Sequence, residues 1–321
     1  MFRNALLGAA VFAVALGAAP ASAEYPEKPV TMIVPFSQGG ATDQIARMFA
    51  EPLEKELGQP VVIVNQPGAG GAVGLANLAQ ARPDGYTIGI GSDSTLAARP
   101  LMSDSGYTHK SFQPIARMVE IPSGVAVRSD SPYQSLEDLV EAMKTEQLTW
   151  SSSGVGSGPH LAMAVFMDKF GVSASHVTSG GNKEALVKLL SGEVDFLSGG
   201  GSNFPPMLDE SGQGDIRVLG LAGEERWQYL PDVPTYTEQG FPYLRSQWFA
   251  LVGPKGMPEE AVDKLSAAVE KIVTDPERQE LLAQFYFDPA YLNPEELNQQ
   301  IEEEMEELQP TLDQAGLAKE S

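Results

Sequence analysis

The stretch Val34-Pro35-Phe36-Ser37-Gln38-Gly39-Gly40-Ala41-Thr42-Asp43 joins a buried strand, predicted over residues 30–36, to an amphipathic helix, predicted over residues 42–57. A glycine turn that opens a helix gathers unpaired backbone N–H groups at the positive end of the helix dipole, which suits an anion. The stretch therefore predicts an α/β fold with a loop that holds a carboxylate or a similar anion, either for capture or for chemistry.

The N-terminus has the pattern of a cleaved secretory signal, residues 1–23. Arg3 precedes an apolar run over residues 5–19, and Ala21-Ser22-Ala23 supplies small residues for cleavage before Glu24. The run is shorter than the roughly 20 apolar residues that span a bilayer, which argues against a membrane anchor. The chain has no cysteine, which excludes disulfides, zinc–thiolate sites and a lipoprotein anchor. We expect a mature protein free in a bacterial periplasm, with no direct insertion into a membrane.

The formal net charge is −22, and −23 once Arg3 leaves with the signal; much of the acidity lies in residues 302–307. Such a charge argues against nucleic acid and anionic membranes as partners. We interpret the acidity as a solubilising surface. An anion bound to so acidic a protein needs local donors, which draws attention to the neutral, glycine-rich loops.

The 298 residues after the signal suggest two domains by length alone. Strands and helices alternate in both halves, an order that implies parallel strands with crossover helices. The predicted strands are 30–36, 61–65, 87–91, 124–127, 148–152, 176–178, 194–197 and 217–221. The predicted helices are 42–57, 73–81, 136–144, 160–170, 183–191, 259–274, 276–285 and 294–313.

The chain passes from the first module to the second near Ile121-Pro122-Ser123-Gly124 and returns near residues 246–251. These crossings predict a discontinuous first lobe, residues 24–123 plus 247–321, on which the C-terminal helices pack, and a second lobe, residues 124–246. Ligands of open parallel sheets lie beyond the carboxyl ends of the strands. The sequence therefore predicts a hinged clamshell with a ligand cleft between the lobes.

Small polar loops recur at strand ends or helix starts in both modules. Each offers hydroxyl and N–H groups without bulk, so the backbone can approach a ligand closely. An isolated loop of this kind is more often an ordinary turn, but the recurrence at corresponding places favours binding. The loops are 36–43, 91–95, 151–158, 179–182 and 197–202.

Other chemistries find little support. Residues 154–158, Gly-Val-Gly-Ser-Gly, match a nucleotide fingerprint only loosely, because the third glycine lacks the required offset. The histidines, His109, His160 and His176, are scattered, without a Gly-x-Ser-x-Gly elbow or a metal-ligand spacing. We expect no cofactor, no metal and no catalytic residue. A secreted hydrolase that uses a loop serine is the enzyme alternative, and it lacks a visible activating base.

Charged residues near the loops have two interpretations each. Asp43 sits in the first turn of the predicted helix, where it can accept backbone N–H bonds, and its expected role is to cap that helix. Asp93 is either structural or a partner for a ligand amine or hydroxyl. Arg99 and Arg245 are the cations that could grip a carboxylate, although a solvated surface arginine is the commoner case.

Motifs in a fixed order cover almost the whole mature chain. They are Tyr25-Pro26-Glu27-Lys28-Pro29-Val30, residues 35–43, Asn65-Gln66-Pro67-Gly68-Ala69-Gly70-Gly71, Pro83-Asp84-Gly85-Tyr86-Thr87, residues 153–161 and Leu230-Pro231-Asp232-Val233-Pro234-Thr235. With them, the chain resembles the periplasmic binding proteins of tripartite tricarboxylate transporters, also called the Bug family. The resemblance implies a two-lobed Venus-flytrap fold that captures a small organic di- or tricarboxylate and delivers it to a membrane permease with two integral subunits.

In that family, the loop after the first strand and the facing loop of the second lobe hold a carboxylate through backbone amides, hydroxyls and bridging waters. Carried over by position, the first-lobe contacts are Phe36, Ser37, Gly39, Gly40, Ala41 and Thr42, with Ser94 and Thr95 beside them. The second-lobe contacts are Ser153, Gly154, Ser157, Gly181, Asn182, Ser198 and Gly199.

Two departures from the family pattern bear on the ligand. Many members carry an aromatic-Lys-Gly stretch where this chain has Ser179-Gly180-Gly181, and a Phe-Asp pair where it has Ser198-Gly199. The replacements remove bulk, a cation and an acid, and they are similar to the branch associated with citrate-type tricarboxylates. We therefore expect a roomier cleft in a monomeric solute-binding protein. A periplasmic sensor partner that presents a carboxylate to a receptor is the alternative that the sequence leaves open.

Overall fold

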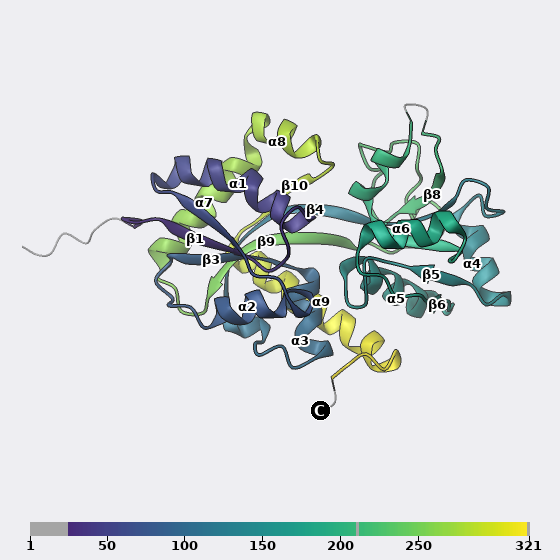
Figure 1. Cartoon of the computed structure of the whole chain (residues 1–321), viewed down its shortest axis with the longest axis horizontal. Coiled ribbons are helices and arrows are strands. Elements are labelled where there is room, and N and C mark those ends of the chain that lie inside the picture. The colour runs from purple at the N-terminus through teal and green to yellow at the C-terminus, as the bar shows by residue number, and fades with distance from the viewer. Residues whose placement is uncertain (1–24, 210–211, 320–321) are drawn as a thin grey trace, which may run out of the picture.

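Two sheets share one long strand in the computed structural model, which describes residues 25–209 and 212–319. The predicted signal, residues 1–23, lies outside the described residues. Figure 1 shows the shared strand β4 and its neighbour β9 running from one half of the molecule into the other. Among the described residues, none of the helices combines the length and the apolar composition that a membrane span requires.

The first sheet has the order β2-β1-β3-β9-β4, and β10 pairs with the first part of β4. Strands β1, β2 and β3 are parallel, whereas β9 is antiparallel to both of its neighbours. The strands are β1 (Val30–Val34), β2 (Val61–Asn65), β3 (Thr87–Ser92), β4 (Phe112–Arg128), β9 (Ser246–Pro254) and β10 (Asp288–Leu292).

The second sheet forms on the other half of β4. Strands β7 and β8 both pair antiparallel with β4, and β5 continues from β7 in parallel, followed by β6. The strands are β5 (Thr149–Ser151), β6 (Ser175–His176), β7 (Phe196–Gly200) and β8 (Ile216–Leu221).

Strand β4 changes partner at one point. Pro122 is paired with Ser246 of β9, and the next residue, Ser123, is paired with Gly200 of β7. We therefore propose that the lobes divide where the sequence predicts, at 123/124 and at 246/247.

Helices cover both faces of each sheet. In the first lobe, α1 and α7 pack on one face, and α2 and the first half of α9 pack on the other. In the second lobe, α4 and α5 cover one face and α6 covers the other. The helices are α1 (Ala41–Leu57), α2 (Ala72–Ala79), α3 (Arg99–Met102), α4 (Leu136–Thr145), α5 (Gly158–Phe170), α6 (Asn182–Ser191), α7 (Glu259–Thr274), α8 (Pro276–Ala283) and α9 (Pro294–Gln314).

Helix α9 contacts both lobes, which differs from the expectation that the C-terminal helices pack on the first lobe. Leu297 and Ile301 join a first-lobe core, whereas Leu308 and Leu312 join the core of α4 and α5. The hydroxyl of Thr311 also donates to Asp168 of α5 at 3.0 Å. Any motion of one lobe against the other therefore acts on α9.

Several segments differ from the sequence prediction. The first strand ends at Val34, since Pro35 has no N–H to donate to a neighbouring strand. The predicted loop 91–95 contains the start of a π-helical turn, Asp93–Ala98. The first part of β4 and all of β10 were not predicted. Strand β4 contains Pro114 and Pro122; its register shifts near Pro114, and the strand continues past both prolines.

Candidate functional site

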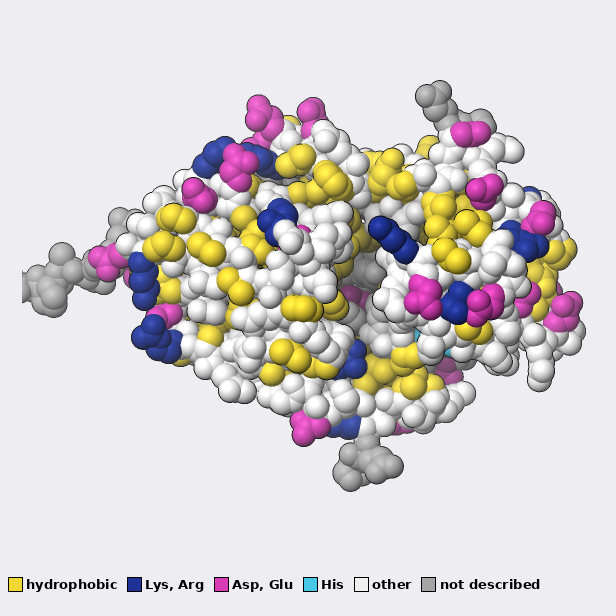
Figure 2. Space-filling view, in the orientation of Figure 1, with side chains coloured by type: hydrophobic (Ala, Val, Ile, Leu, Met, Phe, Trp, Pro, Cys, Tyr) yellow, Lys and Arg dark blue, Asp and Glu magenta, His cyan; other side chains and the backbone are white. Residues whose placement is uncertain are grey.

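A cavity of about 880 Å³ lies between the lobes. Figure 2 shows the surface hollowed between the two halves of the molecule. Four segments form its walls: the β1–α1 loop, the start of α6, the turn after β7 and the segment between α8 and β10. The lining residues are Ser37, Gln38, Gly39, Gly40, Ala41, Gln44, Gly180, Gly181, Asn182, Lys183, Glu184, Ser202, Asn203, Pro206, Gln284, Phe285, Tyr286 and Phe287.

The first-lobe wall is the N-terminus of α1. The N-cap residue is Gly40, whose missing side chain leaves the first amides of the helix without a side-chain cap. Gly39 has φ +86°, a left-handed conformation that favours glycine. Its N–H donates to Asp43 at 2.9 Å, so Asp43 fixes the loop from inside the helix.

Asp43 is a structural acid, as the sequence suggested. Burial alone would raise the pKa of its carboxyl, but hydrogen bonds from Arg47, Gly39 and Asn65 outweigh burial and leave the pKa lowered. Asn65 also donates to the carbonyl of Phe36 at 3.0 Å, which ties the loop to the end of β2. The carboxylate therefore stays ionised and engaged, and the free amides of the helix remain for a ligand.

The second-lobe wall repeats this design at the N-terminus of α6. Its N-cap is Gly181, again without a side-chain cap. Glu184, in the first turn, accepts a hydrogen bond from the N–H of Gly180 at 2.8 Å. Asn182 donates to Asn203 at 3.0 Å, which joins the helix to the turn after β7. Two uncapped helix N-termini thus line the same cavity from opposite lobes.

Four other helices of the described chain are capped by side chains, whereas α2, α3 and α7 have no side-chain cap. Ser135, Ser157, Asp275 and Asn293 accept hydrogen bonds from the first turns of α4, α5, α8 and α9. A side-chain cap is worth about 1 kcal/mol in a typical helix. Its omission at both cavity walls leaves donors for an anion.

The cavity brings together part of the predicted site. Its lining includes Ser37, Gly39, Gly40, Ala41, Gly181 and Asn182. The remaining predicted contacts, which are not among the lining residues, are Phe36, Thr42, Ser94, Thr95, Ser153, Gly154, Ser157, Ser198 and Gly199. Their roles as ligand contacts stay predictions.

The remaining first-lobe residues lie beside the wall. Thr42 is buried in the first turn of α1. A Cβ atom on Gly71 would come within 2.9 Å of Thr95 and within 3.2 Å of the ring of Phe36, so these two side chains meet at Gly71. Ser94 and Thr95 both contact the hydroxyl of Ser92, at 3.0 and 3.2 Å.

The second-lobe serine loop is held mainly by its own hydrogen bonds. Ser157 caps α5 and donates to the carbonyl of Gly154 at 2.7 Å. Ser153 and Gly154 are half-buried.

Ser198 and Gly199 lie in strand β7, so the expected loop over residues 197–202 is wrong for its first half. Gly199 is tightly packed, because a Cβ there would lie 3.1 Å from the ring of Phe204. Ser198 is 2% exposed, and its hydroxyl donates to the carbonyl of Pro159 at 2.8 Å.

Arg245 is not a solvated surface arginine, which corrects the favoured interpretation. It is 5% exposed and forms ion pairs with Glu307 at 3.1 Å and Glu304 at 3.8 Å. These acids lie on α9, and Arg245 immediately precedes β9 at the crossing between the lobes. Its role is therefore structural, at the hinge.

Arg99 lies at the junction of the lobes. A Cβ on Gly70 would come within 2.1 Å of its Nη2 atom, and a Cβ on Gly156 would come within 3.6 Å of the same atom. Gly70 belongs to the first lobe and Gly156 to the second-lobe serine loop. Both loops therefore approach one guanidinium, and the glycine at position 70 is the one that leaves room for it.

The histidines are not all scattered, which corrects that expectation. The rings of His160 and His176 lie 4.6 Å apart beside Trp150. Burial and the neighbouring His176 lower the pKa of His160 to about 4, so it is neutral near pH 7. His176 contacts the hydroxyl of Ser152 at 3.0 Å, but Ser152 is fully buried and cannot reach a substrate. Within the described residues, no group of acids and histidines could hold a metal ion.

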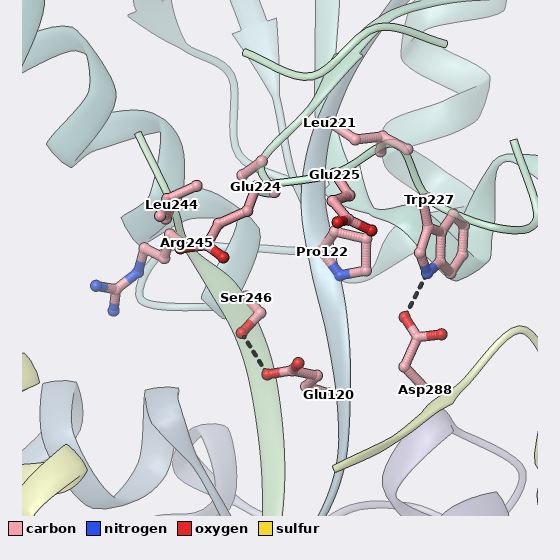
Figure 3. A pocket seen from close by; sticks show the side chains of 12 residues that line it. Glu120, Pro122, Leu221, Glu224, Glu225, Trp227, Leu244, Arg245, Ser246 and Asp288 are labelled. Atoms are coloured by element: carbon pink, nitrogen blue, oxygen red, sulfur yellow. Dashed lines mark hydrogen bonds between the residues drawn. The ribbon is translucent and has the colours of Figure 1, made fainter. Parts of the chain in front are cut away.

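A smaller cavity of about 280 Å³ lies at the strand crossing (Figure 3). Ser246 donates to Glu120 at 3.1 Å on its floor, and Trp227 donates to Asp288, so a second-lobe side chain is tied to β10. Glu224 and Glu225 also line it. Four acids make this cavity unsuitable for an anion.

A buried acidic cluster surrounds Arg245. Asp93 is 2% exposed, and a Cβ on Gly158 at the start of α5 would come within 2.8 Å of its Oδ2 atom. Burial raises the pKa of Asp93 to about 6 and the pKa of Glu304 to about 7, although Arg245 lowers both. Asp93 thus faces the hinge and α5, which supports the structural interpretation of this residue.

The raised pKa values predict a pH dependence of stability. Between about pH 4, where unfolded carboxyls titrate, and about pH 7, the folded cluster binds more protons than the unfolded chain. The stabilisation of the fold that comes from protonating this cluster is therefore fully present below about pH 4, and it is lost as the pH rises to about 7. Relative to Glu304→Gln, we expect the wild-type unfolding free energy to fall by on the order of 2 kcal/mol across this window.

Urea unfolding at a series of pH values checks this prediction. Glu302→Gln, on the exposed side of the same helix, is the matched control and should keep the wild-type slope. Equal slopes for wild type and Glu304→Gln would contradict the assignment.

The fold and the cleft define the class of protein: this is a two-lobed α/β solute-binding protein of the Venus-flytrap type. Solved structures of periplasmic solute-binding proteins have the same fold. The chain belongs to the tripartite tricarboxylate transporter receptor family, whose model, described as "Tripartite tricarboxylate transporter family receptor", matches residues 45–317. It is a periplasmic-type solute-binding protein and not an enzyme, which confirms the fold, the family and the non-enzymatic class predicted from the sequence.

Known proteins resemble the chain over nearly its full length. A UPF0065 protein from the gbd 5' region of Cupriavidus necator is 32% identical over 324 residues, 98% of this chain and 96% of the relative. Rpa4515 of R. palustris, solved with adipate, has a TM-score of 0.80 at 29% identity, covering 92% of this chain and 99% of its own. MatC of Rhodopseudomonas palustris, solved with malate, has a TM-score of 0.76 at 30% identity, covering 90% of this chain and 100% of its own.

Proposed function

We propose that the protein captures a small organic carboxylate in the cavity between its lobes and closes upon it. The proposal rests on one observation: the N-termini of α1 and α6, which have a glycine at the N-cap and no side-chain cap, line one cavity from opposite lobes. Each offers amides at the positive end of a helix dipole, which favours a negative charge. The malate and adipate in two solved relatives support a carboxylate as the ligand.

We expect the lobes to close on the ligand because the backbone N–H donors lie on both lobes. A ligand shifts a two-state equilibrium only by its difference in affinity between the states. A carboxylate that contacts Gly40 alone would bind open and closed forms equally. A ligand that also contacts Gly181 is held better when the lobes approach each other, and so favours the closed form.

We further propose that the closed form delivers its ligand to a membrane permease with two integral subunits, and that the mature protein is a periplasmic monomer. The family to which the chain belongs is described by its role as a transporter receptor, which favours transport over presentation to a sensor.

A thermal-shift screen of ligand-stripped, refolded mature protein tests the capture of a carboxylate. The panel pairs malate, adipate and citrate with their neutral amides. A ligand at about 100 times its dissociation constant stabilises the fold by about 2.7 kcal/mol, which raises the melting temperature by roughly 5 °C. We expect a shift with at least one acid and none with its amide. Stabilisation by amides or by other neutral solutes alone would overturn the proposal.

A further inference from the structure

Two charged side chains line the cavity between the lobes, and they are neighbours in the first turn of α6. The carboxylate of Glu184 is already engaged, because it accepts from the N–H of Gly180 at 2.8 Å and lies 3.9 Å from the ammonium of Lys188. Lys183 is exposed, and it has no ion pair or hydrogen bond among residues 25–209 and 212–319. Lys183 is thus the free cation of this cavity within the described chain.

The position of Lys183 opposes the stability of its own helix. The first turn of a helix is the positive end of its dipole, where acids are favoured and a lysine is disfavoured. The charge therefore does not serve the helix, and Glu184 does not neutralise it. In a chain with a net charge of −22, a free cation beside the uncapped amides of Gly181 makes one small region of the second lobe attractive to an anion.

The segment between α8 and β10 gives the cavity a largely aromatic wall. Phe285 is 40% exposed and lines the cavity with Tyr286 and Phe287. Tyr286 has φ +58°, which costs energy for any residue other than glycine and is found where the surrounding structure holds it. Its ring contacts Tyr229 of the second lobe, with centroids 5.5 Å apart. The strained turn thus keeps an aromatic surface at the cavity.

We propose that Lys183 selects ligands with two carboxylates separated by an apolar spacer. This inference rests on the proposed function and names the substrate class of the same cavity. One carboxylate binds at the N-terminus of α1, the second binds at Lys183 and the first amides of α6, and the spacer lies against Phe285. A cavity of about 880 Å³ is within the usual size of small-molecule sites. A monocarboxylate leaves Lys183 unused.

Calorimetric titration of refolded protein with matched ligand pairs tests the proposal. The pairs are adipate with hexanoate and terephthalate with benzoate, which keep the spacer and remove one carboxylate. For wild type, we expect the diacid of at least one pair to bind about 10- to 100-fold more tightly than its monoacid. This is the gain in affinity that one additional charge-assisted hydrogen bond typically gives. In Lys183→Gln, the diacid should lose that advantage while the monoacid changes little.

Three variants make the result interpretable. Lys183→Arg keeps the charge and should keep most of the preference. Lys255→Gln removes the same charge beyond the far end of β9, away from the crossing at Ser246, and should bind as wild type does. Lys183→Gln should melt no lower than wild type, because the substitution removes a positive charge that opposes the helix dipole.

The outcomes separate the two proposals. If wild type binds carboxylates but Lys183→Gln leaves the preference unchanged, or if diacids and monoacids bind alike, the selection by Lys183 is overturned and carboxylate capture stands. If wild type binds malate or citrate in the thermal-shift screen but neither diacid of the two pairs, the selection alone is overturned. If wild type binds none of the four acids and neither malate nor citrate, carboxylate capture fails, and the selection fails with it.

Discussion

Gly40→Asp is expected to abolish carboxylate binding while leaving the fold at least as stable. Gly40 has φ −80° and ψ 172°, which any residue adopts, and a Cβ there would lie 3.7 Å from the nearest atom, the carbonyl oxygen of Ser37. Aspartate is a preferred N-cap residue, so its side chain should satisfy the first amides of α1 and gain a few tenths of a kcal/mol. The same carboxylate then occupies the place proposed for the ligand.

The expected loss of affinity is large. Two carboxylates about 4 Å apart near a protein surface repel by about 4 kcal/mol, which corresponds to a loss of roughly 1000-fold. The matched control is Gly40→Asn, which has nearly the same shape and also caps helices but carries no charge. We expect Asn to cost less than about 10-fold.

Calorimetric titration and thermal melting of both variants check this prediction. A folded Gly40→Asp protein that binds its acid as wild type does would show that the N-terminus of α1 is not the anion site. Equal losses in the Asp and Asn variants would point to shape and not to charge.

Arg245→Met is expected to cause the largest loss of stability. The change removes the partner of two buried acids, Glu304 and Asp93, at the crossing between the lobes. Removing one member of a buried charge pair typically costs about 3–5 kcal/mol, because the other charge is left uncompensated. Protonation relieves that charge, so the loss should be greater near pH 8 than near pH 5.

Urea unfolding of Arg245→Met at both pH values measures this loss. Arg245→Met with Glu304→Gln removes both charges and should recover a large part of the lost stability. Arg82→Met, at an exposed arginine of the first lobe, is the control and should unfold nearly as wild type does. A small loss for Arg245→Met at pH 8, similar to that of Arg82→Met, would mean that the hinge does not depend on this charge.

Local patterns were sufficient to predict most helices and the first wall of the site. The alternation of strand and helix around residues 34–43 is set by neighbouring residues, and α1 begins one residue before its predicted start. Helix α7 has the bounds that the sequence predicts. Glycines at 39 and 40 pointed to an anion loop because their effect on backbone conformation is local.

The parts that the sequence did not reveal depend on contacts between distant residues. Ser198-Gly199-Gly200 has the composition of a loop, yet it forms part of β7 because Gly199 pairs with Gly124 of β4. The burial of Arg245 depends on acids about 60 positions later in α9. The aromatic wall comes from residues 285–287, and nothing near Phe285 in the sequence indicates that it reaches a cavity formed by residues 37–41. Lys183 was overlooked because a lysine after a glycine turn is ordinary in sequence and unusual only beside this cavity.

Small-angle X-ray scattering of the ligand-stripped protein, with and without a saturating diacid such as adipate, tests most directly the central claim that one carboxylate ligand is held by both lobes. Binding at both α1 and α6 predicts that the radius of gyration falls on saturation in wild type, and that it does not change in Gly40→Asp at the same adipate concentration. A wild-type protein that is saturated by calorimetry but keeps its ligand-free radius of gyration would contradict capture by lobe closure.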